Sequence, residues 1–221
     1  MVTSAKVEKR KFKAVIFDMD GVITDSEPTH MAAEHAVLKD HGVRIDSADW
    51  EGFRGKTTHA IFSAIIGKYQ LELDPVELSD KKTDHYLKLA ETEISLFSGA
   101  RELIEYLHAN YQLALVTSSH QRIQSKVFEK FKLNPFFQVI VTGDMVAHGK
   151  PHPEPYQRAV KMLTLEPQDC IVIEDSDNGI LSAKAAGLAT IGVTHTFPRE
   201  KLEAAGTDYI VSSLEQIRTL F

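Results

Sequence analysis

The sequence has few of the residues that stabilise secreted proteins or anchor membrane proteins. It contains a single cysteine, Cys170, among 221 residues, so no intramolecular disulfide can form. No apolar run approaches the roughly 18 residues that cross a membrane as a helix. The N-terminal residues also lack the apolar stretch of a signal peptide. We therefore expect a soluble cytoplasmic protein that has no membrane partner.

Acidic residues outnumber basic ones, 31 to 25. The formal net charge is -6 with histidine neutral, and a short basic segment stands out only at residues 6–13. Nucleic-acid binders usually carry a basic stripe, whereas a short basic segment at a terminus is typically solvated. We expect no nucleic-acid partner, and because nothing in the sequence demands a dimer we expect a monomer. The length allows one large domain, or one domain with a smaller insertion.

Strand-like and helix-like segments alternate along most of the chain. The β-branched, continuously apolar segments predict buried strands at 12–18, 113–117, 137–141, 170–173, 189–193 and 209–211. Apolar residues at helical spacing predict helices at 101–110, 122–131, 155–163 and 179–186. Strands that alternate with helices indicate an α/β fold, a Rossmann-like parallel sheet with helices on both faces.

One helical stretch interrupts this alternation early in the chain. Ile61 and Ile65 fall on one helical face, as do Tyr86 and Ala90, and Asp74-Pro75 separates two helices. No strand is evident between residues 43 and 96. We therefore predict an α/β core formed by residues 1–25 and 98–221, and an inserted α-helical cap domain formed by residues 26–97.

Two acidic residues, Asp18 and Asp20, follow the first predicted strand. Open α/β sheets bind ligands at the carboxyl ends of their strands, and two close carboxylates require a cation or a proton. Taken alone, the motif is equally compatible with a polar turn.

Polar residues at three further strand ends favour a site. The second strand ends at Thr117 and Ser118, the third leads to a loop with Lys150, and the fourth ends at Glu174 and Asp175. Carboxylates hold a hard cation such as Mg²⁺, while hydroxyl, N–H and lysine groups bind phosphate oxygens. Each residue also has a plainer reading: Glu174 and Asp175 are possible caps of the following helix, and Asp177 is the residue expected to cap it. Plain readings at all four strand ends would require four coincidences.

Four segments together resemble a known family. Residues 18–26, 115–119, 149–156 and 173–180 are similar, in order and spacing, to the four motifs of the haloacid dehalogenase superfamily of phosphohydrolases. The inserted segment is similar to the small α-helical cap of that superfamily. The resemblance implies a phosphatase that uses Mg²⁺, forms an aspartyl phosphate and acts on a small phosphorylated metabolite.

The resemblance also implies residue roles. Asp18 attacks phosphorus, and Asp20 protonates the leaving oxygen and then deprotonates the attacking water. The cation is held by Asp18, the backbone carbonyl of Asp20 and Asp175, with Glu174 supporting them from behind. Thr117 and the N–H of Ser118 hold phosphate oxygens, and Lys150 neutralises the nucleophile and the phosphate.

Within the superfamily, the chain looks most like the β-phosphoglucomutase-like subgroup. His30 and Lys82 fall where the mutase contacts its substrate. Thr58, however, aligns with an arginine that binds the second phosphate in the mutase, and Arg54 or Lys56 would have to replace it. Loss of a bidentate arginine is not a mild change, so a phosphatase acting on a sugar phosphate is preferred and β-phosphoglucomutase is the alternative.

Other chemistries are less well supported. There is no Gly-x-Gly-x-x-Gly for a dinucleotide, and His30, His35 and His41 lack zinc-site spacing. His148 and His152 are interpreted as surface residues rather than ligands. A receiver-type signalling domain would lack the helical insertion. An inactive interaction protein would be expected to lack one of Asp18, Asp20, Lys150 and Asp175, but all four are present.

Overall fold

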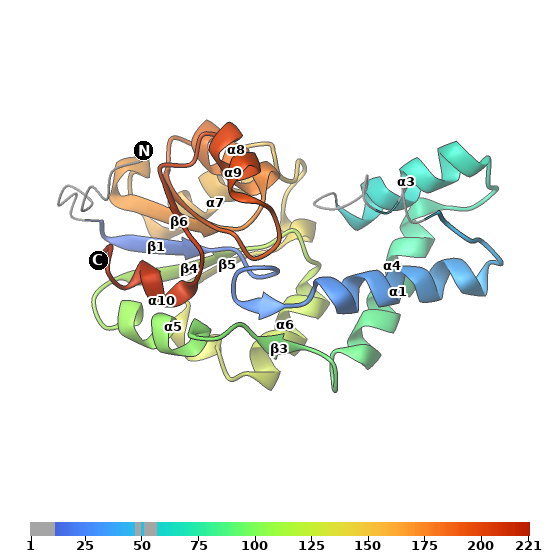
Figure 1. Cartoon of the computed structure of the whole chain (residues 1–221), viewed down its shortest axis with the longest axis horizontal. Coiled ribbons are helices and arrows are strands. Elements are labelled where there is room, and N and C mark those ends of the chain that lie inside the picture. Colours follow the sequence, from blue (N-terminus) through green and yellow to red (C-terminus); the bar gives the residue numbers. More distant parts are fainter. Residues whose placement is uncertain (1–11, 47–49, 51–56) are drawn as a thin grey trace.

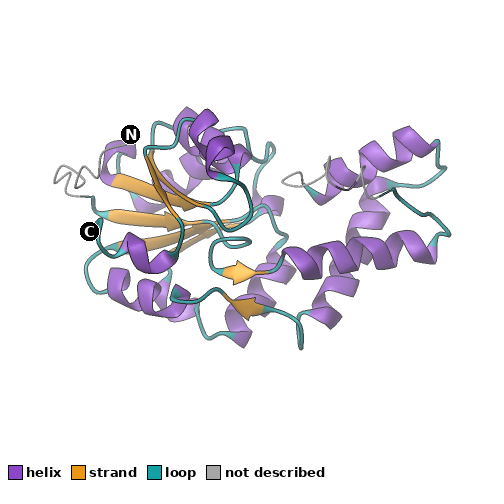
Figure 2. Cartoon of the chain, in the orientation of Figure 1, coloured by secondary structure: helices purple, strands orange, loops and turns teal. Residues whose placement is uncertain are grey.

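The computed structural model describes residues 12–46, 50 and 57–221. Its larger part is a six-stranded parallel sheet in the order β5-β4-β1-β6-β7-β8. The strands are β1 (Ala14–Phe17), β4 (Gln112–Val116), β5 (Val139–Val141), β6 (Cys170–Glu174), β7 (Ala189–Val193) and β8 (Tyr209–Val211). Figure 2 shows this sheet between helices on both of its faces, which confirms the predicted fold class.

The central strand explains why the sheet needs two layers of helices. All four residues of β1 are buried, and successive side chains point to opposite faces. Val15 and Phe17 join an apolar cluster with α5 (Ala100–His108), α6 (Gln121–Lys130) and α10 (Leu214–Ile217). Ala14 and Ile16 join a second cluster with α7 (Glu154–Leu163) and α8 (Asp177–Ala185). Helix α9 (Arg199–Ala204) packs on α8.

The inserted segment forms a helical lobe beside the core (Figure 1). Its described helices are α1 (Glu27–Asp40), α3 (Thr58–Tyr69) and α4 (Pro75–Leu89). Each contributes apolar residues to a separate cluster that includes Leu38, Phe62 and Leu78. Asp74 caps α4 through the backbone N–H of Val76, at the break predicted from Asp74-Pro75. The exact division at residues 25 and 98 remains a prediction.

The prediction that no strand lies between residues 43 and 96 was wrong. β3 (Ser95–Leu96) pairs antiparallel with β2 (Thr24–Asp25), where the chain leaves and re-enters the core. A two-residue strand has too few positions to show a period of two. The pairing fixes the two connections between the lobes side by side.

The cap of α8 also differs from the prediction. Ser176, rather than Asp177, is the N-cap residue, and its hydroxyl oxygen accepts a hydrogen bond from the N–H of Gly179. Serine and aspartate are both favourable N-cap residues, so the sequence does not determine which of Ser176 and Asp177 occupies the N-cap position. The consequence is that the first turn of α8 starts directly behind Glu174 and Asp175.

No helix within the described part of the chain is both long and apolar enough to cross a membrane.

Candidate active site

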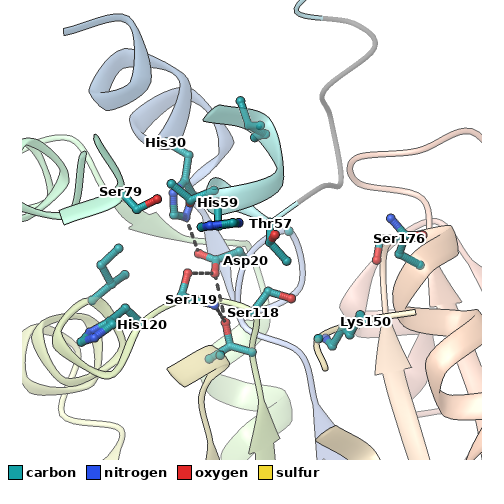
Figure 3. Close-up of a pocket in the computed structure, with 18 of the residues that line it drawn as sticks. Asp20, His30, Thr57, His59, Ser79, Ser118, Ser119, His120, Lys150 and Ser176 are labelled. Atoms are coloured by element: carbon teal, nitrogen blue, oxygen red, sulfur yellow. Dashed lines mark hydrogen bonds and ion pairs between the residues drawn. The ribbon is translucent and has the colours of Figure 1, made fainter. Parts of the chain in front are cut away.

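The carboxyl ends of β1, β4 and β6 open into a cleft that the cap helices cover. The cleft has a volume of about 530 Å³ and is lined by residues of both lobes. In Figure 3, Thr57, His59 and Ser79 face it from the cap, while Ser118, Lys150 and Ser176 face it from the core. Parallel strands bring residues that are far apart in the sequence to this one edge.

Lys150 joins two of the acidic residues. Its Nζ donates to Asp18 Oδ1 and to Glu174 Oε1, each at 2.6 Å, and to the carbonyl oxygen of Val116 at 3.1 Å. Only 6% of the Lys150 side chain is exposed. An ammonium group so deeply buried is tolerated because it is fully hydrogen-bonded and paired. The predicted neutralising lysine is thus in contact with the predicted nucleophile.

Glu174 organises the back of the site. Its Oε1 also accepts a hydrogen bond from the Tyr156 hydroxyl at 2.9 Å, and its Oε2 accepts from the backbone N–H groups of Asp175 and Ser176. Glu174 is fully buried. Both of its oxygens are therefore engaged by protein donors, which suits a residue that positions Lys150.

The acidic side of the cleft has an excess of negative charge. Burial, followed by repulsion from Glu174 and Asp20, raises the pKa of Asp18 to about 8 despite the opposing effect of Lys150. Burial, and then Glu174 and Asp18, also raise the pKa of Asp175 well above its usual value. Three carboxylates here face one lysine, so another positive charge would stabilise their ionised forms.

The donor set fits a hard divalent cation. One carboxylate oxygen from each of Asp18, Glu174 and Asp175 lies within 4.8 Å of the others. An all-oxygen set of this kind is typical of Mg²⁺ sites. These residues could hold a divalent metal, and the charge of the cation would compensate the carboxylates.

Asp20 has a different environment, although it is only two residues from Asp18. Its Oδ1 lies 2.6 Å from the Ser26 hydroxyl and 3.1 Å from His30 Nε2. Its Oδ2 accepts from the hydroxyl group of Ser119 at 2.8 Å (Figure 3). It also accepts from the hydroxyl group of Thr117 at 3.3 Å. Hydrogen bonds to an ionised carboxylate favour the ionised form. Burial acts in the opposite direction, but the attraction to His30 and these hydrogen bonds outweigh it and hold the pKa of Asp20 well below its usual range.

A buried polar chain continues from Asp20 into the cap. His30 Nδ1 lies 2.6 Å from Lys82 Nζ, and the ammonium also donates to Thr58 Oγ1 at 3.2 Å. Lys82 is 2% exposed, and Glu34 Oε1 lies 3.9 Å from its Nζ. Burial lowers the pKa of Lys82 below its usual value, although Glu34 and Asp20 act against this. The cap therefore contacts the core through Asp20, by way of His30.

Gly21 lets these two halves of the site lie close together. Its φ is +87°, and a Cβ atom there would lie 1.9 Å from Asp175 Oδ2. Any side chain would thus meet both a strained backbone conformation and a carboxylate. The glycine allows the turn after Asp20 to pass directly against Asp175.

The structure brings most of the predicted site residues to one cleft. The described residues that line it include Asp18, Asp20, His30, Lys82, Thr117, Ser118, Lys150 and Asp175. Glu174 lies behind them. Arg54 and Lys56, the two candidates for a second phosphate, lie outside the described residues.

Sequence reasoning assigned no role to three further residues. Ser26 and Ser119 both contact Asp20, and Tyr156 contacts Glu174. Ser119 directly follows the predicted phosphate grip at Thr117 and Ser118, so an extra hydroxyl there was an available signal. Ser26 and Tyr156 end two of the motif segments that resemble the family, but their contacts with Asp20 and Glu174 are set by packing.

Comparisons with known proteins agree with this geometry. Residues 15–193 match the family model described as haloacid dehalogenase-like hydrolase. The fructose-1-phosphate phosphatase YqaB of Escherichia coli (strain K12) is 31% identical over 183 residues, which cover 83% of this chain and 97% of the relative.

Two solved structures share the architecture. A mutant of CbbY from Rhodobacter sphaeroides in complex with xylulose-(1,5)bisphosphate has a TM-score of 0.85 at 28% identity, and the match covers 95% of this chain and 99% of that chain. The β-phosphoglucomutase of Clostridium difficile has a TM-score of 0.80 at 26% identity, with 93% of each chain covered. The chain therefore belongs to the haloacid dehalogenase-like hydrolase family, near its capped β-phosphoglucomutase and CbbY-type members, and is a phosphatase of that family.

Proposed function

We propose that this phosphatase depends on Mg²⁺ and hydrolyses a small sugar phosphate through an aspartyl phosphate on Asp18. The observation that carries the proposal is the position of Lys150 Nζ, 2.6 Å from both Asp18 and Glu174. The ammonium group of Lys150, in contact with the proposed nucleophile, also lies where the negative charge of an incoming phosphate must be offset.

In the first step, an oxygen of the Asp18 carboxylate attacks phosphorus and the bond from phosphorus to the sugar oxygen breaks. Thr117, the N–H of Ser118 and Lys150 hold the phosphate oxygens during this transfer. In the second step, water attacks phosphorus, the aspartyl phosphate is cleaved and inorganic phosphate leaves. Phosphoryl transfer depends mainly on such positioning and charge stabilisation.

Asp20 carries protons in both steps. The sugar oxygen needs a proton as it leaves, and the attacking water must lose one. With its pKa held well below the usual range, Asp20 is ionised before substrate binds. It must therefore receive a proton before it can donate one. The chain from Lys82 through His30 is placed to supply it, with His30 giving its Nε2 proton to Asp20 as its Nδ1 takes one from Lys82.

Mg²⁺ would be held by Asp18, the backbone carbonyl of Asp20 and Asp175, with Glu174 supporting the group. When bound, it compensates the charge of the carboxylates and of the phosphate so that they can approach one another. Chelation should abolish phosphate release, and added Mg²⁺ should restore it. Full activity in the presence of excess chelator would contradict the proposed metal dependence.

The relative that acts on fructose 1-phosphate supports a sugar phosphate as substrate. A panel of sugar phosphates, nucleotides and phosphoglycolate, assayed for phosphate release, would test this choice. We expect the highest kcat/KM on a sugar monophosphate. A clear preference for nucleotides or phosphoglycolate would contradict it.

Similarity to a β-phosphoglucomutase favours one second candidate, phosphoryl transfer within β-glucose 1-phosphate. Thr58, which aligns with the mutase arginine, has no charge and accepts a hydrogen bond from Lys82. This argues against a cationic clamp at position 58. Formation of glucose 6-phosphate from β-glucose 1-phosphate with a bisphosphate activator, without net phosphate release, would favour the mutase.

A further inference from the structure

A second group of potential metal ligands lies on the loop that carries Lys150. One ring nitrogen each of His148 and His152 and one carboxylate oxygen of Glu154 lie within 4.8 Å of one another. Both histidines are exposed, and none of the three residues is among those that line the cleft. The group is therefore separate from the carboxylates proposed to hold Mg²⁺.

Glu154 arranges the other two side chains. Its Oε2 lies 3.1 Å from His148 Nδ1 and accepts the backbone N–H of His148 at 3.0 Å, while its Oε1 accepts the N–H of Ala147 at 2.8 Å. The backbone N–H of Glu154 donates to His152 Nδ1 at 3.2 Å. Glu154 thus contacts the His148 ring through its carboxylate and the His152 ring through its backbone N–H.

The two imidazole rings also face each other. Their centroids are 4.7 Å apart, with an angle of 36° between the ring planes. The carbonyl oxygen of His152 is fixed by the Ser182 hydroxyl at 2.6 Å, which anchors one side of the pair to α8.

We propose that His148, His152 and Glu154 form a binding site for a borderline transition-metal ion such as Zn²⁺, Cu²⁺ or Ni²⁺. Two imidazoles and one carboxylate suit these ions and not Mg²⁺. Tetrahedral bonds of about 2.0 Å place ligand atoms roughly 3.3 Å apart, so the three side chains would have to move closer together to bind an ion, and the two exposed histidines have room to do so. Solvent water would complete the coordination shell.

Because of its position in the chain, an ion bound at this site would restrain the loop that carries Lys150. Lys150 lies between His148 and His152, and the loop continues into α7 at Glu154. A bound ion would link the two sides of the loop whose lysine contacts Asp18 and Glu174. Metal binding should therefore raise the melting temperature of the protein, without any requirement for turnover.

Electron paramagnetic resonance of bound Cu²⁺ tests the site, because imidazole nitrogens split the signal and carboxylate oxygens do not. The full chain, with excess Mg²⁺ present, should bind one Cu²⁺ with a two-nitrogen signature. His148→Ala and His152→Ala should each remove one nitrogen. In the double variant, we expect at least about a tenfold loss of affinity, since losing even an indirect metal contact typically costs that much.

His85→Ala is the matched control. His85 Nε2 also pairs with a carboxylate, Asp40 Oδ2 at 3.0 Å, on the cap helices. The control variant should keep the wild-type spectrum and the metal-induced rise in melting temperature. An unchanged spectrum in the His148/His152 double variant, a spectrum with oxygen ligands only, or no binding of Cu²⁺ would each overturn the proposal.

Discussion

Asp18 and Asp20 are two residues apart at the end of the same strand, yet their surroundings are opposite. Asp18 lies among other carboxylates with one lysine in contact, and its pKa is raised to about 8. Asp20 accepts hydrogen bonds from hydroxyl groups and approaches His30, and its pKa is held well below the usual range. Burial raises the pKa of both, so the difference comes from the partners.

This difference separates the site into two halves. The Asp18 half belongs to the core sheet, is short of positive charge and is suited to bind a cation and a phosphate. The Asp20 half joins the core to the cap, through His30 and Lys82, and is suited to move a proton. Two neighbouring carboxylates are thereby suited to the separate tasks proposed for them, as environment-driven pKa differences allow.

Removing the nucleophile should have the largest effect on activity. We expect Asp18→Asn to lower kcat by roughly 10⁴-fold or more, because removal of a nucleophile abolishes the covalent route. The melting temperature should stay the same or rise, since the substitution removes one carboxylate from a charge-rich cluster. Turnover close to that of the wild type would show that Asp18 is not the attacking group.

Removing the lysine should damage both stability and activity. Lys150→Met leaves Asp18 and Glu174 buried without their partner, which typically costs about 3–5 kcal/mol of unfolding free energy. Added Mg²⁺ should recover part of this loss by supplying positive charge. Urea denaturation with and without Mg²⁺ measures the loss of unfolding free energy and its recovery.

Lys184→Met is the matched control for that substitution. Lys184 pairs with Asp208 at 2.9 Å, but both side chains are about one-third exposed, at 35% and 36%. Exposed pairs contribute at most about 1 kcal/mol. An equal loss of stability in the two variants would mean that the ion pairs of Lys150 are not specially important.

Breaking the polar chain from the cap should have an intermediate effect. Lys82→Met removes the donor to His30, and we expect kcat for a sugar phosphate to fall by about 10- to 100-fold, at the lower end of general acid–base effects. An aryl phosphate needs little protonation of its leaving group, so its turnover should fall less. Lys81→Met changes the neighbouring lysine, which is 42% exposed and pairs with Glu77, and should have no comparable effect. Equal losses for both substrates would contradict a role in proton delivery.

The smallest predicted effect concerns the joint between the lobes. Lys130 on α6 donates to the carbonyl oxygens of Ala90, Glu91 and Ile94 at 2.7, 3.1 and 3.0 Å, just after the last turn of α4. Lys130→Ala should cost about 1–2 kcal/mol, because it leaves partly buried carbonyl groups unpaired. Lys126→Ala removes an exposed pair with Glu91 and should cost less than about 1 kcal/mol. Thermal unfolding of both variants compares them.

The Asp18 half was largely predictable from the sequence, because a buried parallel sheet gathers its strand ends at one edge. The apolar strands alone predict that Asp18, Thr117 and Glu174 lie at the carboxyl ends of strands. The Asp20 half was less predictable from the sequence. His30 and Lys82 were identified by resemblance as substrate contacts, whereas in the structure they also contact one another. Such a contact depends on how the cap helices pack on the core.

Two local features were predicted incorrectly from the sequence: the N-cap residue of α8 and the short strands β2 and β3. Ser176 caps α8 although Asp177 was expected to do so, because both residue types favour that position. β2 and β3 were missed because two residues carry no periodicity. The roles of individual site residues follow from chemistry and resemblance, and they remain proposals that only the variants can test.

Trapping the covalent intermediate would show whether Asp18 is the nucleophile. The wild-type enzyme, mixed with its best sugar phosphate and Mg²⁺ and quenched with acid within one turnover, should gain the mass of one phosphoryl group. Peptide mapping should place that group on Asp18, and Asp18→Asn should acquire none. A phosphoryl group on another residue, or phosphate release at full rate with no covalent species at any quench time, would contradict the account.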